Sequence, residues 1–435
     1  MKNHIVVLSC LLSATAFAVD NTYTGPKVEL TFIHGYTASD RIDMENLVKK
    51  FNESHPNISV KASAVAWGTT YQQIGPLVAA GKAPDVLAMT ENVINNFVAK
   101  NAVAEITAAD LKKLGIKSSN YYKNLWAGGT YKNKVYGVPF SQVSVVMFYN
   151  QNLLDKYGIK KLPKTYKEFL AAAQKCTVDQ NGKKPGEAGF DQAKLATYGW
   201  GVSHNAAGAL FTAYGAVRSF GGNTVDKDFN PDFNSPEAVK AIQTYVDFVT
   251  KHQVSPAKLT DDTAVSDFRG GKSCFNTNGA WMYNFYSDAK NIKLGVAFPP
   301  ALGSKPSAWG AHTHLVLPRQ KDSYDANKRA AALEFIRFMT DKEQMLAFTE
   351  SGALPTQPAV ANDPRYAKNP FAPIKNNLKN IYIPTGWPWV DQVQNAMFLA
   401  VENAILGKKS VQDALNDGVK EAEKNVNEAR QSLGL

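Results

Sequence analysis

The stretch VELTFIHGYTASDRIDMENLVKKFNESHPNISV, residues 28–60, decides the fold. Apolar and polar residues alternate over residues 28–32, which predicts an opening strand. After a polar turn, four apolar residues with helical spacing predict a helix: Met44, Leu47, Val48 and Phe51. Residues 58–60 predict a second strand, so the stretch forms a strand–helix–strand unit.

The same alternation continues along the chain. Residues 71–80 predict a helix, residues 81–85 a turn and residues 86–89 a buried strand. Residues 301–309, rich in Gly, Pro and Ser, predict a linker. Further strands are predicted over 143–149, 197–202, 294–298 and 312–317. Further helices are predicted after the capping box at Thr165 and Glu168 and over 236–249, 262–269, 332–339, 390–406 and 410–430. This order predicts an α/β protein with crossover connections and a mostly parallel sheet.

Length and composition indicate a protein with two large lobes. The chain has 435 residues, which is too long for one small core. Its net charge is +10, but the densest basic clusters are only pairs of lysines. A nucleic-acid-binding protein needs a concentrated basic face, so this class is disfavoured. The charge leaves open an acidic ligand or an anionic membrane surface.

The N-terminal residues 1–18 have the order of a secretory signal peptide. A positive charge in residues 1–4 precedes a short apolar run over residues 5–12, and Ala16-Phe17-Ala18 forms a cleavage site. The apolar run is shorter than the roughly 20 residues that cross a bilayer. We therefore expect an exported, periplasmic protein that begins near Val19. Acylation of Cys10, as in a lipoprotein, is the disfavoured alternative.

Export would place the remaining cysteines in an oxidising compartment, where disulfides form. Cys10 lies in the predicted signal peptide, which leaves Cys176 and Cys274. Two cysteines in an oxidising compartment often pair, and one bridge across so long a loop would stabilise the fold by about 4–5 kcal/mol. Two separate buried thiols are the alternative that the residues leave open.

Catalytic signatures are missing from the sequence. It has no His-Glu-x-x-His, no Gly-x-Ser-x-Gly and no Gly-x-Gly-x-x-Gly after a strand. Gly270-Gly271-Lys272-Ser273 ends like a phosphate-binding loop, but Ser266 stands where that loop needs glycine. His312 and His314 have no third metal ligand in view, so a core or hydrogen-bonding role is favoured.

The tryptophans favour ligand binding. Trp67 lies near a strand end and the following helix start, and Trp281 follows Asn278-Gly279-Ala280. Trp387 and Trp389 lie in a loop, Thr385-Gly-Trp-Pro-Trp. A flat apolar ring stacks on the C–H face of a sugar, while neighbouring Asn, Asp and Glu accept from or donate to its hydroxyl groups.

Six segments in order resemble the solute-binding proteins of bacterial carbohydrate importers of the ABC type, the group that includes maltose-binding protein. They are AGKAPDVLAMTENVI (80–94), YGVPFSQVSVVMFYNQNLLDKYGI (136–159), LPKTYKEFL (162–170), FRGGKSCFNTNGAW (268–281), ESGALPT (350–356) and LGKKSVQDAL (406–415). The resemblance covers nearly the whole mature chain.

This resemblance implies the periplasmic-binding-protein fold, with two α/β lobes, a hinge and a ligand cleft between the lobes. The expected N-terminal lobe comprises residues 19–142 and 300–347, and the C-terminal lobe comprises residues 143–299 and 348–435. The expected function is to capture a mono- or oligosaccharide or a polyol and to deliver it to membrane permease subunits. We expect a monomer without enzymatic activity, cofactor or bound metal.

The predicted ligand-binding residues follow from the tryptophans and the resemblance: Trp67, Tyr71, Glu91, Asn92, Trp281, Gly310, His312, Trp387 and Trp389, with His204 and Asn205 as secondary candidates. Within the family, the glycerol-3-phosphate-binding branch is similar at Tyr71 and Glu91, and it also carries cysteines at the positions of Cys176 and Cys274.

Departures from that branch favour a neutral ligand. Ala353 stands where the branch has tyrosine, and residues 386–389 contain tryptophan where it has arginine. A buried phosphate ester without arginine lacks its best charge-assisted partner. Binding of glycerol-3-phosphate or a glycerophosphodiester is therefore the alternative. A secreted glycan-degrading enzyme is a further rival, and a surface adhesin would need an anchor that only Cys10 offers.

Overall fold

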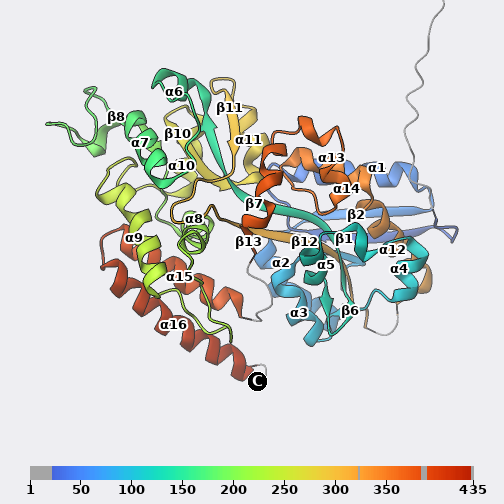
Figure 1. Ribbon diagram of the computed structural model, residues 1–435. Coiled ribbons are helices and arrows are strands. Elements are labelled where there is room, and N and C mark those ends of the chain that lie inside the picture. The colour runs from blue at the N-terminus through green and yellow to red at the C-terminus, as the bar shows by residue number, and fades with distance from the viewer. Residues whose placement is uncertain (1–21, 322–323, 384–388, 433–435) are drawn as a thin grey trace, which may run out of the picture.

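The computed structural model describes residues 22–321, 324–383 and 389–432 of the chain. It shows a mixed α/β protein with two lobes joined by long central strands (Figure 1). The predicted signal peptide and Trp387 lie outside the described residues. In the part of the chain that the structure describes, no helix is both long enough and apolar enough to cross a bilayer.

One sheet of eleven strands runs through both lobes in the described residues. Its main path follows the order β2 (Ile58–Ala64), β1 (Val28–His34), β3 (Val86–Thr90), β12 (Ala308–Pro318), β7 (Gly137–Asn150), β10 (Ser273–Gly279), β9 (Leu195–Trp200) and β8 (Val178–Asp179). Three strands pair beside this path: β4 (Val103–Ala104), β11 (Leu294–Ala297) and β13 (Ile381–Tyr382). The pairs β1–β2, β1–β3, β9–β10 and β12–β13 are parallel. The other six pairs of this sheet in the described residues are antiparallel, so the predicted mostly parallel sheet is wrong, because β7 and β12 run against most of their neighbours.

Strand β7 connects the two lobes. Residues 137–144 pair with β12, whereas residues 145–150 pair with β10 and β11. All but two of its residues are buried. Its second half is a run of apolar residues, as in a strand covered on both faces, whereas its first half also buries Ser141, Gln142 and Ser144. The antiparallel pair β7–β12 lies between the two groups of helices (Figure 1).

The first lobe forms around β1, β2 and β3. On one face Leu30 and Phe32 pack against α1 (Arg41–Ser54), α12 (Ala326–Met339) and α13 (Lys342–Phe348). The other face packs against α2 (Trp67–Ala79) and α3 (Glu91–Ala99). The predicted apolar face of α1 is confirmed because all four of its residues are buried: Met44, Leu47, Val48 and Phe51. The shorter helices α4 (Ala108–Leu114) and α5 (Lys123–Gly128) follow, with the hairpin β5 (Thr130–Tyr131) and β6 (Lys134–Val135).

The second lobe forms around the other half of the sheet. Its core packs the strands against five long helices: α7 (Tyr166–Cys176), α8 (Ala206–Ser219), α9 (Pro236–Thr250), α15 (Val390–Ile405) and α16 (Val411–Ser432). A disulfide joins Cys176 at the end of α7 to Cys274 in β10, with both side chains fully buried. The predicted bridge is confirmed. Three short helices complete the lobe: α6 (Gln151–Lys156), α10 (Asp261–Arg269) and α11 (Tyr283–Ser287).

After α13 the chain follows the junction between the lobes. Ala353 and Tyr366 pack in the first-lobe core, whereas Leu354 packs with the second half of β7. The backbone of Leu354 also exchanges two hydrogen bonds with Gln142 of β7. This segment contains α14 (Pro358–Ala361) and several short 3₁₀ turns.

The predicted linker over residues 301–309 is wrong at its C-terminal end. Ala308 and Trp309 begin β12 and pair with Ile381 and Tyr382 of β13. Their strand conformation depends on a partner more than 70 residues away in the sequence, which the local Gly/Pro/Ser composition does not reveal.

Candidate ligand-binding site

A hollow of about 290 Å³ lies where the loop after β1, the central strands and the turn after β10 meet. Three tryptophans line it: Trp67 at the start of α2, Trp281 in the turn after β10 and Trp309 in the central strand β12. Tyr36, Asp40, Thr90 and Thr313 add polar groups to the lining. The hollow therefore combines aromatic surface with a few hydrogen-bonding groups, as small-molecule sites do.

Trp67 lies flat against the backbone of the loop after β1. A Cβ atom at Gly35 would overlap the indole ring of Trp67. The ring of Tyr36 meets this indole edge-on, with centroids 5.5 Å apart and an interplanar angle of 76°. Glycine at position 35 thus allows Trp67 to form one wall of the hollow. Its contact with a ligand stays a prediction.

Trp281 is supported in the same way from the second lobe. A Cβ atom at Gly279 would overlap its ring, so the indole lies directly on this glycine. Trp309 stands perpendicular to it, with ring centroids 6.4 Å apart and an interplanar angle of 87°. Two indoles at a right angle present one flat face and one edge to a molecule between them.

Asp40 supplies the acidic group of the hollow. Its side chain is only 8% exposed, and its Oδ1 atom has no hydrogen-bond partner among the described residues. Burial raises the pKa of Asp40 to about 7. Among the described residues that line the hollow, none is a lysine or an arginine. A hydroxyl donor from a ligand would satisfy the carboxyl group.

Tyr71 and Asn92 hold the hydroxyl group of Thr90, which lines the hollow. The Tyr71 Oη atom accepts the Thr90 N–H at 3.0 Å and lies 2.8 Å from Thr90 Oγ1. Thr90 Oγ1 in turn donates to Asn92 Oδ1 at 2.6 Å. Two predicted site residues therefore act here on a third residue that the sequence did not single out.

Glu91 and His312 lie behind the hollow. They are 3% and 1% exposed, and the His312 backbone N–H donates to Glu91 Oε2 at 2.8 Å. Burial raises the pKa of Glu91 to about 8, whereas burial and the neighbouring His314 lower the pKa of His312. Both side chains are therefore predominantly uncharged near neutral pH. They form a buried layer that supports Thr90 and Thr313.

Packing and hydrogen bonding within the protein explain the presence of Gly310 and His314. A Cβ atom at Gly310 would overlap Ile381 and the backbone oxygen of Val143. His314 Nε2 lies 3.0 Å from the Leu125 carbonyl oxygen. Close strand packing thus accounts for the glycine, and a core hydrogen bond accounts for the histidine.

Trp389 does not line the hollow. It packs in the core of the second lobe, where its Nε1–H donates to the Phe229 carbonyl oxygen at 3.2 Å. The Arg430 guanidinium lies 4.4 Å from the centre of a Trp389 ring. The secondary candidates lie elsewhere in the same lobe, since Asn205 Oδ1 accepts the backbone N–H of Asp261.

Sequence reasoning missed Tyr36, Asp40 and Trp309. Asp40 precedes a helix and looks like a cap, although it makes no side-chain capping hydrogen bond. Trp309 fell inside the predicted linker. The signal that was available for Trp309 is the one used for the other tryptophans, namely an indole beside glycine, here Gly310.

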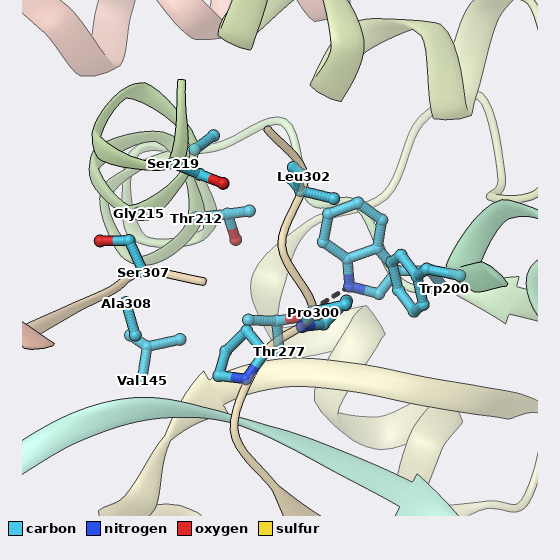
Figure 2. A pocket seen from close by; sticks show the side chains of 13 residues that line it. Val145, Trp200, Thr212, Gly215, Ser219, Thr277, Pro300, Leu302, Ser307 and Ala308 are labelled. Carbon is cyan, nitrogen blue, oxygen red and sulfur yellow. Dashed lines mark hydrogen bonds between the residues drawn. The ribbon is translucent and has the colours of Figure 1, made fainter. Parts of the chain in front are cut away.

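A second, smaller cavity lies inside the second lobe (Figure 2). Trp200 Nε1–H donates to Thr277 Oγ1 at 2.8 Å beside it, and Thr212, Pro300 and Leu302 complete much of its lining. Its volume of about 30 Å³ has room for a water molecule but not for a sugar ring. Three further hollows of about 430, 690 and 480 Å³ each lie within one lobe and have no tryptophan in their described lining. The hollow between the lobes, with its three indoles, is therefore the candidate ligand site.

Two lobes joined by crossing strands, with an aromatic hollow between them, define a two-lobed binding protein. A family model described as bacterial extracellular solute-binding protein matches residues 46–374. The chain belongs to this family of bacterial extracellular solute-binding proteins, and the predicted resemblance is confirmed at the level of the family.

Individual relatives are distant but similar over most of their length. A putative binding protein of Brucella abortus is 21% identical over 421 residues, which cover 95% of this chain and 96% of the relative. The galactooligosaccharide-binding protein of Bacillus subtilis is 24% identical over 396 residues, which cover 88% and 86%.

Solved structures show the same fold. The substrate-binding protein Lmo0181 of Listeria monocytogenes, in complex with cycloalternan, has a TM-score of 0.76 and 20% identity and covers 92% of this chain and 99% of its own. The GacH receptor of Streptomyces glaucescens has a TM-score of 0.77 and 20% identity, with coverage of 93% and 99%. The predicted two-lobed binding-protein fold is confirmed.

Proposed function

We propose that the protein captures a neutral carbohydrate, either a mono- or oligosaccharide or a polyol, and delivers it to an ABC importer. The observation that carries the proposal is the hollow between the lobes, with three indoles and the carboxyl group of Asp40. Stacking of a sugar ring on Trp281 or Trp67, and a hydroxyl donated to Asp40, would together define its orientation.

The names of similar proteins support this ligand class. The Bacillus subtilis relative is named for galactooligosaccharides, and a second relative from the same organism is a maltodextrin-binding protein. Similar solved structures contain cycloalternan, maltose, tagatose and mannotriose. The range of these ligands supports a carbohydrate without choosing one.

The charge of the hollow favours a neutral ligand over a phosphate ester. Its described lining contains Asp40 and lacks lysine and arginine. A phosphate dianion would meet a carboxyl group in place of a charge-assisted donor. We therefore rank glycerol-3-phosphate and glycerophosphodiesters below neutral sugars.

The proposal also assigns roles to the site residues and to the predicted signal peptide. Trp67 and Trp281 contact the ligand directly, and Tyr71, Asn92, Glu91 and His312 shape the site from behind. Residues 1–18 direct export to the periplasm, where the protein works as a monomer, performs no reaction and passes its ligand to the membrane permease subunits.

A thermal-shift screen of the mature protein tests the proposal. The panel contains maltose, maltotriose, mannotriose, tagatose, galactooligosaccharides, glycerol-3-phosphate and glycerophosphodiesters. A ligand present at a hundredfold excess over its Kd stabilises the folded state by about 2.7 kcal/mol. A shift with a neutral sugar alone supports the proposal, and a shift with a phosphate ester alone refutes it. Analysis of the recovered sugar for cleavage products distinguishes binding from hydrolysis.

A further inference from the structure

Two hydrogen bonds join the lobes at the edge of the hollow. Ser39 Oγ donates to the Trp281 carbonyl oxygen at 2.6 Å. Asn284 Nδ2 donates to Asp43 Oδ2 at 3.0 Å. Ser39 and Asp43 flank the start of α1, whereas Trp281 lies in the turn that leads into α11 and Asn284 lies in the first turn of that helix.

The two sides of this contact belong to separately packed cores. Met44, the residue after Asp43, is buried in the first-lobe core with β1. Ala280 and Tyr286, on either side of the turn, pack with Phe148 in the second half of β7. The two hydrogen bonds therefore depend on how the lobes lie relative to one another.

The contact reaches the ligand site through Trp281. Ser39 lies between Ala38 and Asp40, which both line the hollow, but Ser39 is not part of the lining. It bonds instead to the backbone of the residue whose indole forms a wall. A shift of the second lobe by a few ångströms would break this bond and move the wall away from Trp67.

We propose that Ser39 and Asp43 are positioning residues of an interlobe latch, which places Trp281 against the hollow and stabilises the closed arrangement of the lobes. This inference rests on the proposed function, because the closed arrangement is the one that would capture the ligand. The latch residues do not line the hollow, so they act on affinity through the fraction of closed molecules.

The charges around Asp43 allow a sharp test. Its carboxylate accepts the Asn284 amide, and Glu350 is a second acidic group close to it. Asn284→Asp therefore places another carboxylate against Asp43 and should force the latch apart. Adding Asp43→Asn restores one amide and one carboxylate with their roles exchanged. Ser39→Ala removes the other bond, and Ser39→Thr retains a hydroxyl donor.

The distance between the lobes is measured without ligand by electron–electron double resonance. Spin labels are placed on Lys82→Cys in the first lobe and Lys424→Cys in the second, two exposed positions. Cys176 and Cys274 are bonded to each other and do not compete for label. Lys290→Gln, an exposed change just after the helix that carries Asn284, is the matched control.

We expect Asn284→Asp and Ser39→Ala to shift the population toward longer distances. The Asp43→Asn/Asn284→Asp pair and Ser39→Thr should return it toward that of the wild type, and Lys290→Gln should leave it unchanged. Identical distance distributions in the wild type, Asn284→Asp and Ser39→Ala would overturn the latch. Failure of the exchanged pair to restore the distances would overturn the Asp43–Asn284 half of it.

Ligand kinetics provide the second readout, with maltotriose as the probe. Loss of one such bond, worth about 1 kcal/mol, should raise the maltotriose dissociation rate about threefold to tenfold. The exchanged pair should restore the slow rate. If maltotriose does not bind at all, that result bears on the proposed function, and the ligand-free distances still decide the latch.

Discussion

The backbone N–H of His312 donates a 2.8 Å hydrogen bond to Oε2 of Glu91, so the central strand β12 is tied to the start of α3 directly behind the hollow. Burial raises the pKa of this carboxyl group from its ordinary value of 4.5 to about 8. At neutral pH the folded protein therefore holds a proton on Glu91 that the unfolded chain has released.

This proton makes the stability of the protein depend on pH. Between about pH 4.5 and about pH 8 the folded state binds more protons at Glu91 than the unfolded state does. The free energy of unfolding should therefore fall as the pH rises through this window. Glu91→Gln keeps an acceptor for the His312 N–H but cannot ionise, so it should remove this part of the pH dependence.

Urea unfolding of the wild type and Glu91→Gln at about pH 5 and about pH 8 measures the effect. His312 and Asp40 are present in both proteins, so their titration cancels in the difference. The wild type should lose stability relative to Glu91→Gln at the higher pH. A difference that does not change with pH would contradict the buried, protonated state of Glu91.

Asp40 should make ligand affinity depend on pH in the opposite sense. Burial raises its pKa to about 7, and a carboxylate accepts a sugar hydroxyl more strongly than a neutral carboxyl group does. Affinity for a neutral sugar should therefore increase as the pH rises through about 7 and level off above it. Asp40→Asn should weaken binding about tenfold at high pH, the effect of losing one charged hydrogen bond.

Isothermal titration calorimetry across this pH range compares the two proteins. The Asp40→Asn variant should show little pH dependence between about pH 6 and about pH 8.5, because its amide does not titrate. If the variant retained the same pH profile as the wild type, another group would be responsible and Asp40 would not contact the ligand.

Gly35 should be essential to the position of Trp67. A methyl group at Gly35 overlaps the indole ring, so Gly35→Ala must move the ring out of the hollow. We expect sugar affinity to fall about tenfold, the loss of a good part of one aromatic contact. Gly68→Ala is a matched control in the first turn of α2, since a Cβ atom there meets nothing within 4 Å. Equal affinities of the two variants would remove Trp67 from the site.

The disulfide should contribute stability without contributing to binding. It closes a loop with a sequence separation of 98 between α7 and β10, away from the hollow at the other end of β10. Replacing Cys176 and Cys274 together by alanine should lower the free energy of unfolding by about 4–5 kcal/mol on the chain-entropy model. Denaturant unfolding and sugar titration of the double variant, each compared with the wild type, measure the two effects separately.

Much of the fold follows from local patterns. The apolar spacing of α1 and the apolar run in the second half of β7 each reflect burial against one or two neighbours, and both were predicted from the sequence. The first half of β7, residues 137–142, was not predicted as a strand. The bounds of the late helices also agree closely, because α15 and α16 are long and strongly periodic.

Features that depend on distant partners were not predictable in this way. Trp309 belongs to β12 through pairing with β13. Asp40 is buried in the folded protein, and its neighbours in the chain do not reveal this burial. The lobe boundary at residues 347/348 remains a prediction, and Ala353 and Tyr366 pack with the first lobe beyond it. Among the loop tryptophans, only contacts in space separate Trp281 beside the hollow from Trp389 in the core.

Trp281 and Trp389 therefore offer the most direct test of the site. Trp281 lies on Gly279 at the hollow, whereas Trp389 is 8% exposed and packs in the second-lobe core. Trp281→Ala should weaken sugar binding about tenfold to a hundredfold, as loss of a stacking anchor does, with little change in the melting temperature. Trp389→Ala opens a cavity in the core, so it should lower the free energy of unfolding by about 3–5 kcal/mol. It should leave sugar affinity nearly unchanged, because Trp389 does not line the hollow. Calorimetric titration and thermal unfolding of both variants give the four values needed. The reverse pattern, with affinity lost at Trp389 and stability lost at Trp281, would place the ligand against the second-lobe core instead of between the lobes.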